Sequence, residues 1–137
     1  MTTHLSASGL ASLPANVGIP RYSRASLKAG IVHIGVGNFH RAHQAVYLDD
    51  LFNTGEGHDW AMIGAGVREA DEVMRQKLKA QDWYTTVVEQ EAGKSEAHVT
   101  GAMIDYIRPG DTAALLDLLA DPAIRIVSLT ITPPRGR

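Results

Sequence analysis

Two closely spaced glycines, Gly35 and Gly37, stand where a strand-like segment gives way to a helix-like one. Residues 31–36 are apolar apart from His33 and rich in β-branched side chains, which predicts a strand buried on both faces. Glycines at such a junction allow a tight turn, and the start of the next helix presents free backbone N–H groups that favour a phosphate. The third glycine of the dinucleotide-binding fingerprint is replaced by His40, so the spacing alone fits a purely structural turn equally well.

A carboxylate that could select the cofactor follows the next strand-like segment. Asp71 stands just past it, where a carboxylate can accept both ribose hydroxyls of an adenosine and repel a 2′-phosphate. It lies 36 residues after Gly35 (71 − 35), against roughly 20 in the generic fingerprint. Asp71 could equally be a helix-opening acid, as could Glu69 and Glu72. The Asp71 carboxylate favours NAD, whereas Arg68 beside it can bind a 2′-phosphate. We therefore expect NAD as the cofactor, with NADP tolerated.

Three basic side chains follow the glycine turn. His40 and His43 form a poor metal pair, because no third ligand stands at a suitable spacing, so we expect no metal site. We place His40 in the lining of a cofactor pocket instead. For Arg41 two kinds of partner stay open, a phosphate or the carboxylates Asp49 and Asp50.

Thr130 and Thr132 stand at the carboxyl end of the last strand-like segment. In open α/β sheets, ligands lie outside the carboxyl ends of the strands. We therefore expect Thr130 to contact the ribose of a nicotinamide, although threonine is also an ordinary strand residue.

An alternation of strands and helices positions these residues. We expect helices over 38–53, 69–80 and 111–120, and strands over 30–36, 60–67, 83–89, 98–107 and 124–132. The segments 83–89 and 98–107 flank a turn and are consistent with an antiparallel hairpin. The order predicts an α/β fold, a partial Rossmann-like and mostly parallel sheet of about four strands with flanking helices and a small antiparallel excursion. The leucines of the helix over 111–120 are expected in the core.

Length and composition limit the classes of function. The 137 residues leave room for one domain with a core, which we place at 30–137 as a dinucleotide-binding domain, behind an N-terminal arm over 1–29. A net charge of −2 provides no basic field for nucleic acid or for an anionic membrane surface. The sequence contains no cysteine and no apolar run of about twenty residues. We therefore expect neither disulfides nor a membrane-spanning helix, and we expect a cytoplasmic location.

Four strings of residues extend beyond the bare glycine pattern. They are Gly35-Val-Gly-Asn-Phe-His-Arg-Ala-His-Gln44, Trp60-Ala-Met-Ile-Gly-Ala-Gly-Val-Arg68 with Asp71 after it, Gln81-Asp-Trp-Tyr-Thr85 and Ile124-Arg-Ile-Val-Ser-Leu-Thr-Ile-Thr132. With these strings the chain resembles the mannitol dehydrogenase family, the polyol-specific long-chain dehydrogenases, over nearly everything from Ile31 to Thr132. The resemblance implies that the glycine turn is a pyrophosphate cradle and that Phe39 lies beside the cofactor. The expected cofactor-binding residues are Ile34, Gly35, Val36, Gly37, Asn38, Phe39, His40, Arg41, Asp71 and Thr130.

The resemblance also implies a chemistry. Family members are two-domain enzymes that pass hydride from a secondary alcohol of mannitol, or of a related polyol or sugar acid, to NAD or NADP without zinc. Their catalytic lysine lies in a C-terminal domain, so no catalytic residue is assigned to this chain. We expect the cofactor-binding portion of an enzyme with mannitol 2-dehydrogenase activity (mannitol to fructose), inactive by itself. The alternatives are a sugar-acid reductase acting on fructuronate or tagaturonate, and a non-catalytic, truncated NAD-binding fragment.

The last residues depart from the family pattern. Two prolines open the segment 133–137, and they remove the donors that would continue a strand. We therefore expect a truncated cofactor domain, with the C-terminal catalytic domain absent. Residues 126–132 are uncharged and β-prone. If they form an open sheet edge, we expect self-association and low solubility.

Overall fold

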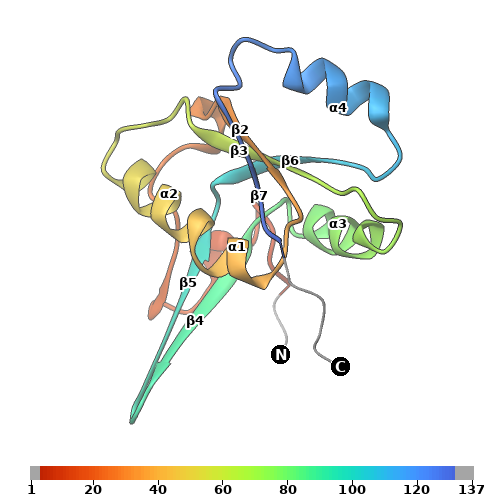
Figure 1. The fold of residues 1–137 in the computed structure, drawn as a ribbon. Helices are drawn as coiled ribbons and strands as arrows, with labels where there is room; N and C mark the ends of the chain where they lie inside the picture. The colour runs from red at the N-terminus through yellow and green to blue at the C-terminus, as the bar shows by residue number, and fades with distance from the viewer. Residues whose placement is uncertain (1–3, 132–137) are drawn as a thin grey trace.

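A parallel sheet of four strands forms the centre of the molecule (Figure 1). The computed structural model describes residues 4–131. The strands follow the order β6-β3-β2-β7, and each neighbouring pair is parallel. Their bounds are β2 (Ala29–Ile34), β3 (Ala61–Ala65), β6 (Met103–Ile107) and β7 (Ile126–Leu129). The chain steps from β2 outward to β3 and β6 and then returns to the other side of β2 with β7, which confirms the predicted Rossmann-like α/β fold.

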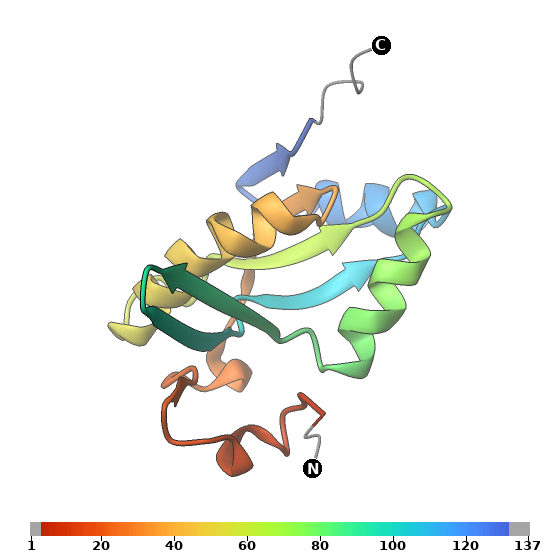
Figure 2. The ribbon, with the colours of Figure 1, turned by 90° about the horizontal axis from the view of Figure 1, so that it is seen from below.

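Helices cover both faces of this sheet. Helices α1, α2 and α3 lie on one face and α4 on the other (Figures 1 and 2). Their bounds are α1 (Asn38–Ala42), α2 (Gln44–Asn53), α3 (Asp71–Ala80) and α4 (Thr112–Leu119). Phe52 of α2 and Met62 of β3 are fully buried in the larger core cluster. Among the described residues, no helix is long and apolar enough to cross a membrane.

A second, smaller sheet carries the predicted antiparallel excursion. Strands β4 (Thr85–Glu91) and β5 (Lys94–Thr100) form a hairpin, and the short strand β1 (Val17–Gly18) pairs in parallel with β5. Gly93 makes the hairpin turn with a positive φ of +79°, a conformation that glycine adopts without strain. The hairpin extends away from the parallel sheet (Figure 1).

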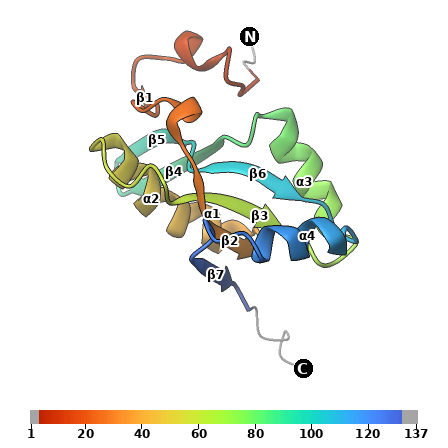
Figure 3. The same ribbon diagram turned by 90° about the horizontal axis from the view of Figure 1, so that it is seen from above.

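The N-terminal segment lies beside β5 and β6 (Figure 3) and is tied to them through Asp49 of α2. The Asp49 side chain is buried, with 2% of the residue exposed, and accepts hydrogen bonds from the Tyr22 hydroxyl and from the Gly101 N–H at 3.0 Å. Arg24 donates to the Met103 carbonyl at 3.0 Å. A single buried carboxylate therefore holds the N-terminal segment, α2 and the β5–β6 junction together.

The helix predicted over 38–53 is divided in two. It is interrupted at His43, whose φ of −123° and ψ of −78° separate α1 from α2. Phe39 of α1 is 66% exposed, whereas Ala45 and Phe52 of α2 pack into the core. The prediction of one helix over 38–53 was therefore wrong at His43, and only the second of the two helices packs Phe52 into the core.

The strand predicted over 98–107 is also two strands, β5 and β6, which belong to different sheets. β5 ends at Thr100, and the next backbone N–H, that of Gly101, donates to the Asp49 carboxylate instead of to a neighbouring strand. A Cβ at Gly101 would come within 2.8 Å of the Tyr84 ring, so the packing there requires glycine. β6 thereby becomes a strand of the parallel sheet.

Helix α4 is more exposed than predicted, and strand β7 lies at an open edge of the sheet. The α4 leucines are not core residues, since Leu116 is 60% and Leu119 37% exposed, and no residue of α4 is buried. β7 is an edge strand whose described pairing is with β2 alone, and it is shorter than the predicted 124–132. Thr132 and residues 133–137 lie outside the described residues. Both elements are exposed because no further layer of the described chain packs over α4 or beside β7.

Candidate functional site

A pocket of about 280 Å³ opens at the carboxyl ends of β2 and β7, the point where the strand order reverses. Its walls come from the β2–α1 turn, the β3–α3 loop and the end of β7. In open α/β sheets this crevice is where ligands bind. It brings together most of the predicted site residues and adds one more, with the lining Gly35, Val36, Gly37, Asn38, Phe39, Arg68, Asp71 and Thr130.

The β2–α1 turn leaves room for a ligand against its backbone. Gly35 has a φ of +86° and donates its N–H to the Ala65 carbonyl at 3.1 Å. The backbone conformation therefore favours glycine at this position. Gly37 has no such need, because its φ of −112° suits any residue and a Cβ there would meet nothing within 4 Å. A glycine that neither strain nor packing requires, facing a pocket, is consistent with a ligand that approaches the main chain closely.

Asn38 and Phe39, the residues after Gly37, line the same pocket. The first α-helical bond of α1 runs from the Arg41 N–H to the Gly37 carbonyl at 3.1 Å. The N–H groups of residues 38–40 precede that bond and are therefore free of intrahelical acceptors. Such a row of amides at a helix start favours an anion.

Arg41 braces this turn rather than pairing with an acid. Its Nε donates to the Gly37 carbonyl at 3.3 Å, and its guanidinium also donates to the Asn38 side chain. The expected alternative of a salt bridge to Asp49 or Asp50 was wrong, because Asp49 is engaged by the N-terminal segment and the β5–β6 junction. Arg41 itself does not line the pocket.

Asp71 opens α3 and organises the β3–α3 loop. Its carboxylate accepts the N–H groups of Val67 at 3.0 Å and Arg68 at 2.9 Å, and it pairs with the Arg68 guanidinium at 3.1 Å. Partial burial acts to raise the pKa of Asp71, but the donors of Arg68 and Val67 outweigh it and hold that pKa below its usual range. The Arg68 side chain is 79% exposed and the Asp71 side chain 12% exposed. The carboxylate is therefore fixed and ionised, while the guanidinium extends into solvent.

A neighbouring hollow continues the site past Asp71. It has a volume of about 350 Å³ and lies between the β3–α3 loop and the loop after β6, with Val67, Arg108 and Pro109 among its walls. Glu69 and Glu72 line this hollow and not the pocket at the glycine turn. The sequence reasoning missed Arg108 and Pro109. Recognising β6 as a separate parallel strand would have placed its carboxyl end at the same sheet edge.

Behind the turn lies a buried pair of histidines that the sequence reasoning also missed. The rings of His33 and His40 stack at a centroid distance of 3.8 Å, and the two residues are 3% and 2% exposed. His40 therefore does not line the pocket, contrary to expectation. Ile34 does not line it either, and its carbonyl accepts the Thr130 N–H at 3.3 Å.

Phe39 lies on the open side of the pocket. It packs beside the ring of His43 at 4.6 Å and is otherwise exposed, so it is a pocket wall and not a core residue. In the described part of the chain, no group of three potential ligands is placed to hold a metal ion.

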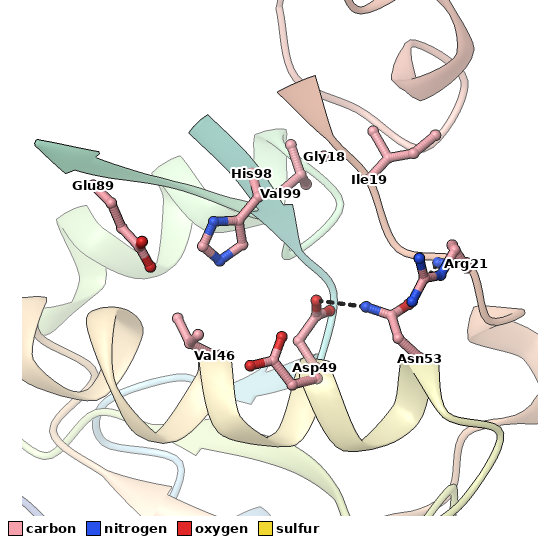
Figure 4. Close-up of a pocket in the computed structure, with 10 residues that line it drawn as sticks. Gly18, Ile19, Arg21, Val46, Asp49, Asn53, Glu89, His98 and Val99 are labelled. Atoms are coloured by element: carbon pink, nitrogen blue, oxygen red, sulfur yellow. Dashed lines mark hydrogen bonds between the residues drawn. The ribbon is translucent and has the colours of Figure 1, made fainter. Parts of the chain in front are cut away.

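A second pocket, of about 240 Å³, lies between α2 and the small sheet (Figure 4). Arg21, Asp50, Glu89 and His98 line it, together with the engaged Asp49. It shares no lining residue with the pocket at the glycine turn. Its mixed charges and its place away from the carboxyl ends of the parallel strands make the glycine-turn pocket the candidate site.

Comparisons with known proteins agree with this geometry. Residues 29–134 match the family model described as the mannitol dehydrogenase Rossmann domain. A mannitol 2-dehydrogenase of Cereibacter sphaeroides is 59% identical over 82% of this chain, which spans 24% of that protein. A polyol:NADP oxidoreductase of Gluconobacter oxydans is 46% identical over 90% of this chain and 26% of its own length.

A solved structure gives the same result. The mannitol 2-dehydrogenase of Pseudomonas fluorescens, in a ternary complex with NAD and D-mannitol, matches with a TM-score of 0.91 and 46% identity, over 94% of this chain and 27% of that one. The chain thus spans about a quarter of the length of the relatives that it matches. On its fold, its motifs and these matches, the chain belongs to the mannitol dehydrogenase family and carries the Rossmann domain of that family.

Proposed function

We propose that this chain binds NAD in the glycine-turn pocket and forms the cofactor-binding portion of a polyol dehydrogenase. The observation that carries the proposal is Gly37, a glycine with open space before it at the strand-order reversal. A dinucleotide diphosphate fits that space, since Gly37, Asn38 and Phe39 line it and the first amides of α1 have no intrahelical acceptor. A Cβ at Gly37 would occupy the place of the ligand.

The remaining parts of NAD find matching walls. The fixed carboxylate of Asp71 suits the adenosine ribose, and the hollow beside Val67, Arg108 and Pro109 suits the adenine. Thr130, at the end of β7, faces the nicotinamide side. We retain all ten residues of the sequence-based set, with Ile34, His40 and Arg41 supporting the turn from outside the pocket lining.

NAD is favoured over NADP, with NADP tolerated. The ionised Asp71 repels a 2′-phosphate, whereas the exposed Arg68 guanidinium can turn toward one. The relatives differ in the same respect, because the Pseudomonas fluorescens structure contains NAD and the Gluconobacter oxydans protein is named for NADP.

For the reaction of the whole enzyme, we propose hydride transfer between the nicotinamide and a secondary alcohol of a polyol, with mannitol as the first candidate. NAD supplies the hydride acceptor, and this chain binds and orients it, which lowers the entropic cost of the step. We assign residues 30–137 to the dinucleotide-binding domain and residues 1–29 to an N-terminal arm, whose described part is bonded to that domain through Tyr22 and Arg24. No catalytic residue is assigned here, so the chain alone is expected to bind cofactor without turning over polyol.

The exposed edge of β7 supports one further proposal, self-association. Ile126 is 44%, Val127 52% and Leu129 58% exposed on a strand that is paired on one side in the described chain. An uncharged edge of this kind pairs readily with a second copy.

Calorimetric titration of the chain with NADH tests the cofactor proposal. Two glycine variants with opposite expected effects on NADH affinity and on stability provide a control. Gly37→Ala should keep the thermal stability and lose NADH affinity, because its Cβ meets only the ligand space. Gly93→Ala, in the remote hairpin turn at φ +79°, should lose about 1 kcal/mol of stability and keep the affinity. An unsubstituted chain that does not bind NADH would refute the proposal. Oxidation of mannitol by the chain alone would show that a base has been overlooked.

A further inference from the structure

The stacked histidines join the two ends of the glycine turn. His33 lies in β2, one residue before the strand ends at Ile34, and His40 lies in α1 after the turn. Their rings are nearly parallel, with an interplanar angle of 13° and a centroid separation of 3.8 Å. Because both residues are almost completely buried, the pair forms the inner wall against which the turn rests.

Each ring is held by named polar partners. The Nδ1 of His40 lies 3.0 Å from Oε1 of Gln44, an atom that only accepts, so Nδ1 carries the hydrogen. The Nδ1 of His33 lies 2.7 Å from the Ser128 hydroxyl, and its Nε2 lies 3.1 Å from the Thr130 hydroxyl. Gln44 also donates to Ser128 at 3.5 Å, which closes the network between α2, β2 and β7.

The charge state of the pair follows from this geometry. The Nε2 of His40 has no hydrogen-bond partner among the described residues, so a proton there would be buried without an acceptor. Burial, then the neighbouring His33, lowers the pKa of His40 to about 4, and the nearby Arg41 acts in the same direction. Burial also lowers the pKa of His33. Two neutral rings can stack closely, whereas two imidazolium rings would repel each other.

Thr130 connects the pair to the pocket. Its hydroxyl is bonded to His33, its N–H is bonded to Ile34, and it lines the pocket opposite Gly35. A hydroxyl that turns freely would have to be ordered by the ligand, at an entropic cost. A hydroxyl already held by a ring nitrogen presents its remaining hydrogen-bonding capacity in one direction.

On the basis of the proposed NAD site, we propose that His33 and His40 are positioning residues that hold the glycine turn and the Thr130 hydroxyl in place for the diphosphate and nicotinamide side of the dinucleotide. The stack does not touch the hollow beside Val67 and Arg108, where adenine is proposed to bind. Loss of the network should therefore weaken the binding of NADH and leave the binding of adenosine alone unchanged.

The test compares two probes on the 137-residue chain. NADH binding is followed by fluorescence, and adenosine binding by the NMR shifts of the Val67 and Arg68 amides. His33→Phe keeps a ring for stacking and removes both hydrogen bonds, so NADH affinity should fall about tenfold, the size of one lost hydrogen bond. Thr130→Val removes the hydroxyl that bonds Nε2 of His33, at a position that is only partly buried. This variant should lose a similar amount of NADH affinity. Adenosine affinity should stay within about twofold in both variants.

His58 offers a matched control. It is a half-buried histidine with both ring nitrogens bonded, to the Ser26 hydroxyl at 3.2 Å and the Phe52 carbonyl at 3.1 Å, and it does not line the pocket. His58→Phe should keep its NADH affinity. Unchanged NADH affinity in Thr130→Val or in a folded His33→Phe variant would overturn the positioning role, as would an equal loss of NADH and adenosine binding. If the unsubstituted chain binds adenosine but not NADH, the proposed function fails as well, which separates the two failures.

Discussion

Lowering the pH from 7.5 to 5 should destabilise this chain through the buried His40. His40 is 2% exposed, and burial followed by the neighbouring His33 lowers its pKa in the folded chain to about 4 from 6.5. In the unfolded chain His40 is exposed and takes up a proton below its ordinary pKa. The folded chain then binds fewer protons than the unfolded one, so the free energy of unfolding falls as the pH drops.

The size of the effect follows from the pKa. Stability begins to fall as the pH passes below 6.5, and the loss from this group is complete near pH 4. At pH 5, 1.5 pH units of that window have been crossed (6.5 − 5), at roughly 1.4 kcal/mol each. The expected loss from His40 is therefore about 2 kcal/mol, and His33 adds to it in the same direction.

Urea unfolding at the two pH values, for the unsubstituted chain and for His40→Phe, isolates this contribution. The variant keeps a ring on His33 but has no group to protonate at position 40, so its stability should depend less on pH. Asp49, whose pKa is raised by burial, acts in the opposite direction in both proteins and cancels in the comparison. An equal loss of stability in the two proteins would refute the reasoning.

Three further perturbations test other parts of the structure. Asp71→Ala should shift the ratio of NADPH to NADH affinity at least about tenfold toward NADPH, because the charge that repels a 2′-phosphate is removed; fluorescence titration with both cofactors checks it, and an unchanged ratio contradicts it. Asp49→Ala should cost about 1–3 kcal/mol in urea unfolding, since the Tyr22 hydroxyl loses its acceptor and the Gly101 N–H keeps only the Tyr22 hydroxyl; a loss below about 0.5 kcal/mol would deny Asp49 this role. Val127→Lys should shift the chain toward monomer in sedimentation equilibrium, because a charge on the β7 edge opposes strand pairing; the same mass distribution in both proteins would rule out pairing through this edge.

Local sequence patterns were enough to predict the centre of the fold. The apolar, β-branched run before Gly35 predicted β2, the segment 60–67 predicted β3, and the segment 111–120 predicted α4, which Asp111 caps by accepting the Ala114 N–H at 3.0 Å. These elements can be predicted from the spacing of apolar residues and from capping residues within a short segment. The pocket lining around Gly37 and Asp71 could be anticipated for the same reason, since the carboxyl ends of parallel strands meet at one edge.

The features that were missed depend on contacts between distant parts of the chain. The end of β5 at Gly101 is set by Tyr84 and Asp49, neither of which is apparent in the apolar run over 98–107. The His33–His40 stack arises because the turn folds β2 against α1, and a spacing of seven residues gives no signal for it. The exposure of the α4 leucines reflects what lies over that face, which helical periodicity alone does not define.

An amide NMR titration of the chain with NADH shows whether a dinucleotide diphosphate lies against the backbone after Gly35. We expect the largest shifts at the N–H groups of Gly37, Asn38 and Phe39, with smaller ones at the β3–α3 loop. Resonances of these amides that stay in place while those of Arg21 and His98 in the second pocket move would contradict it.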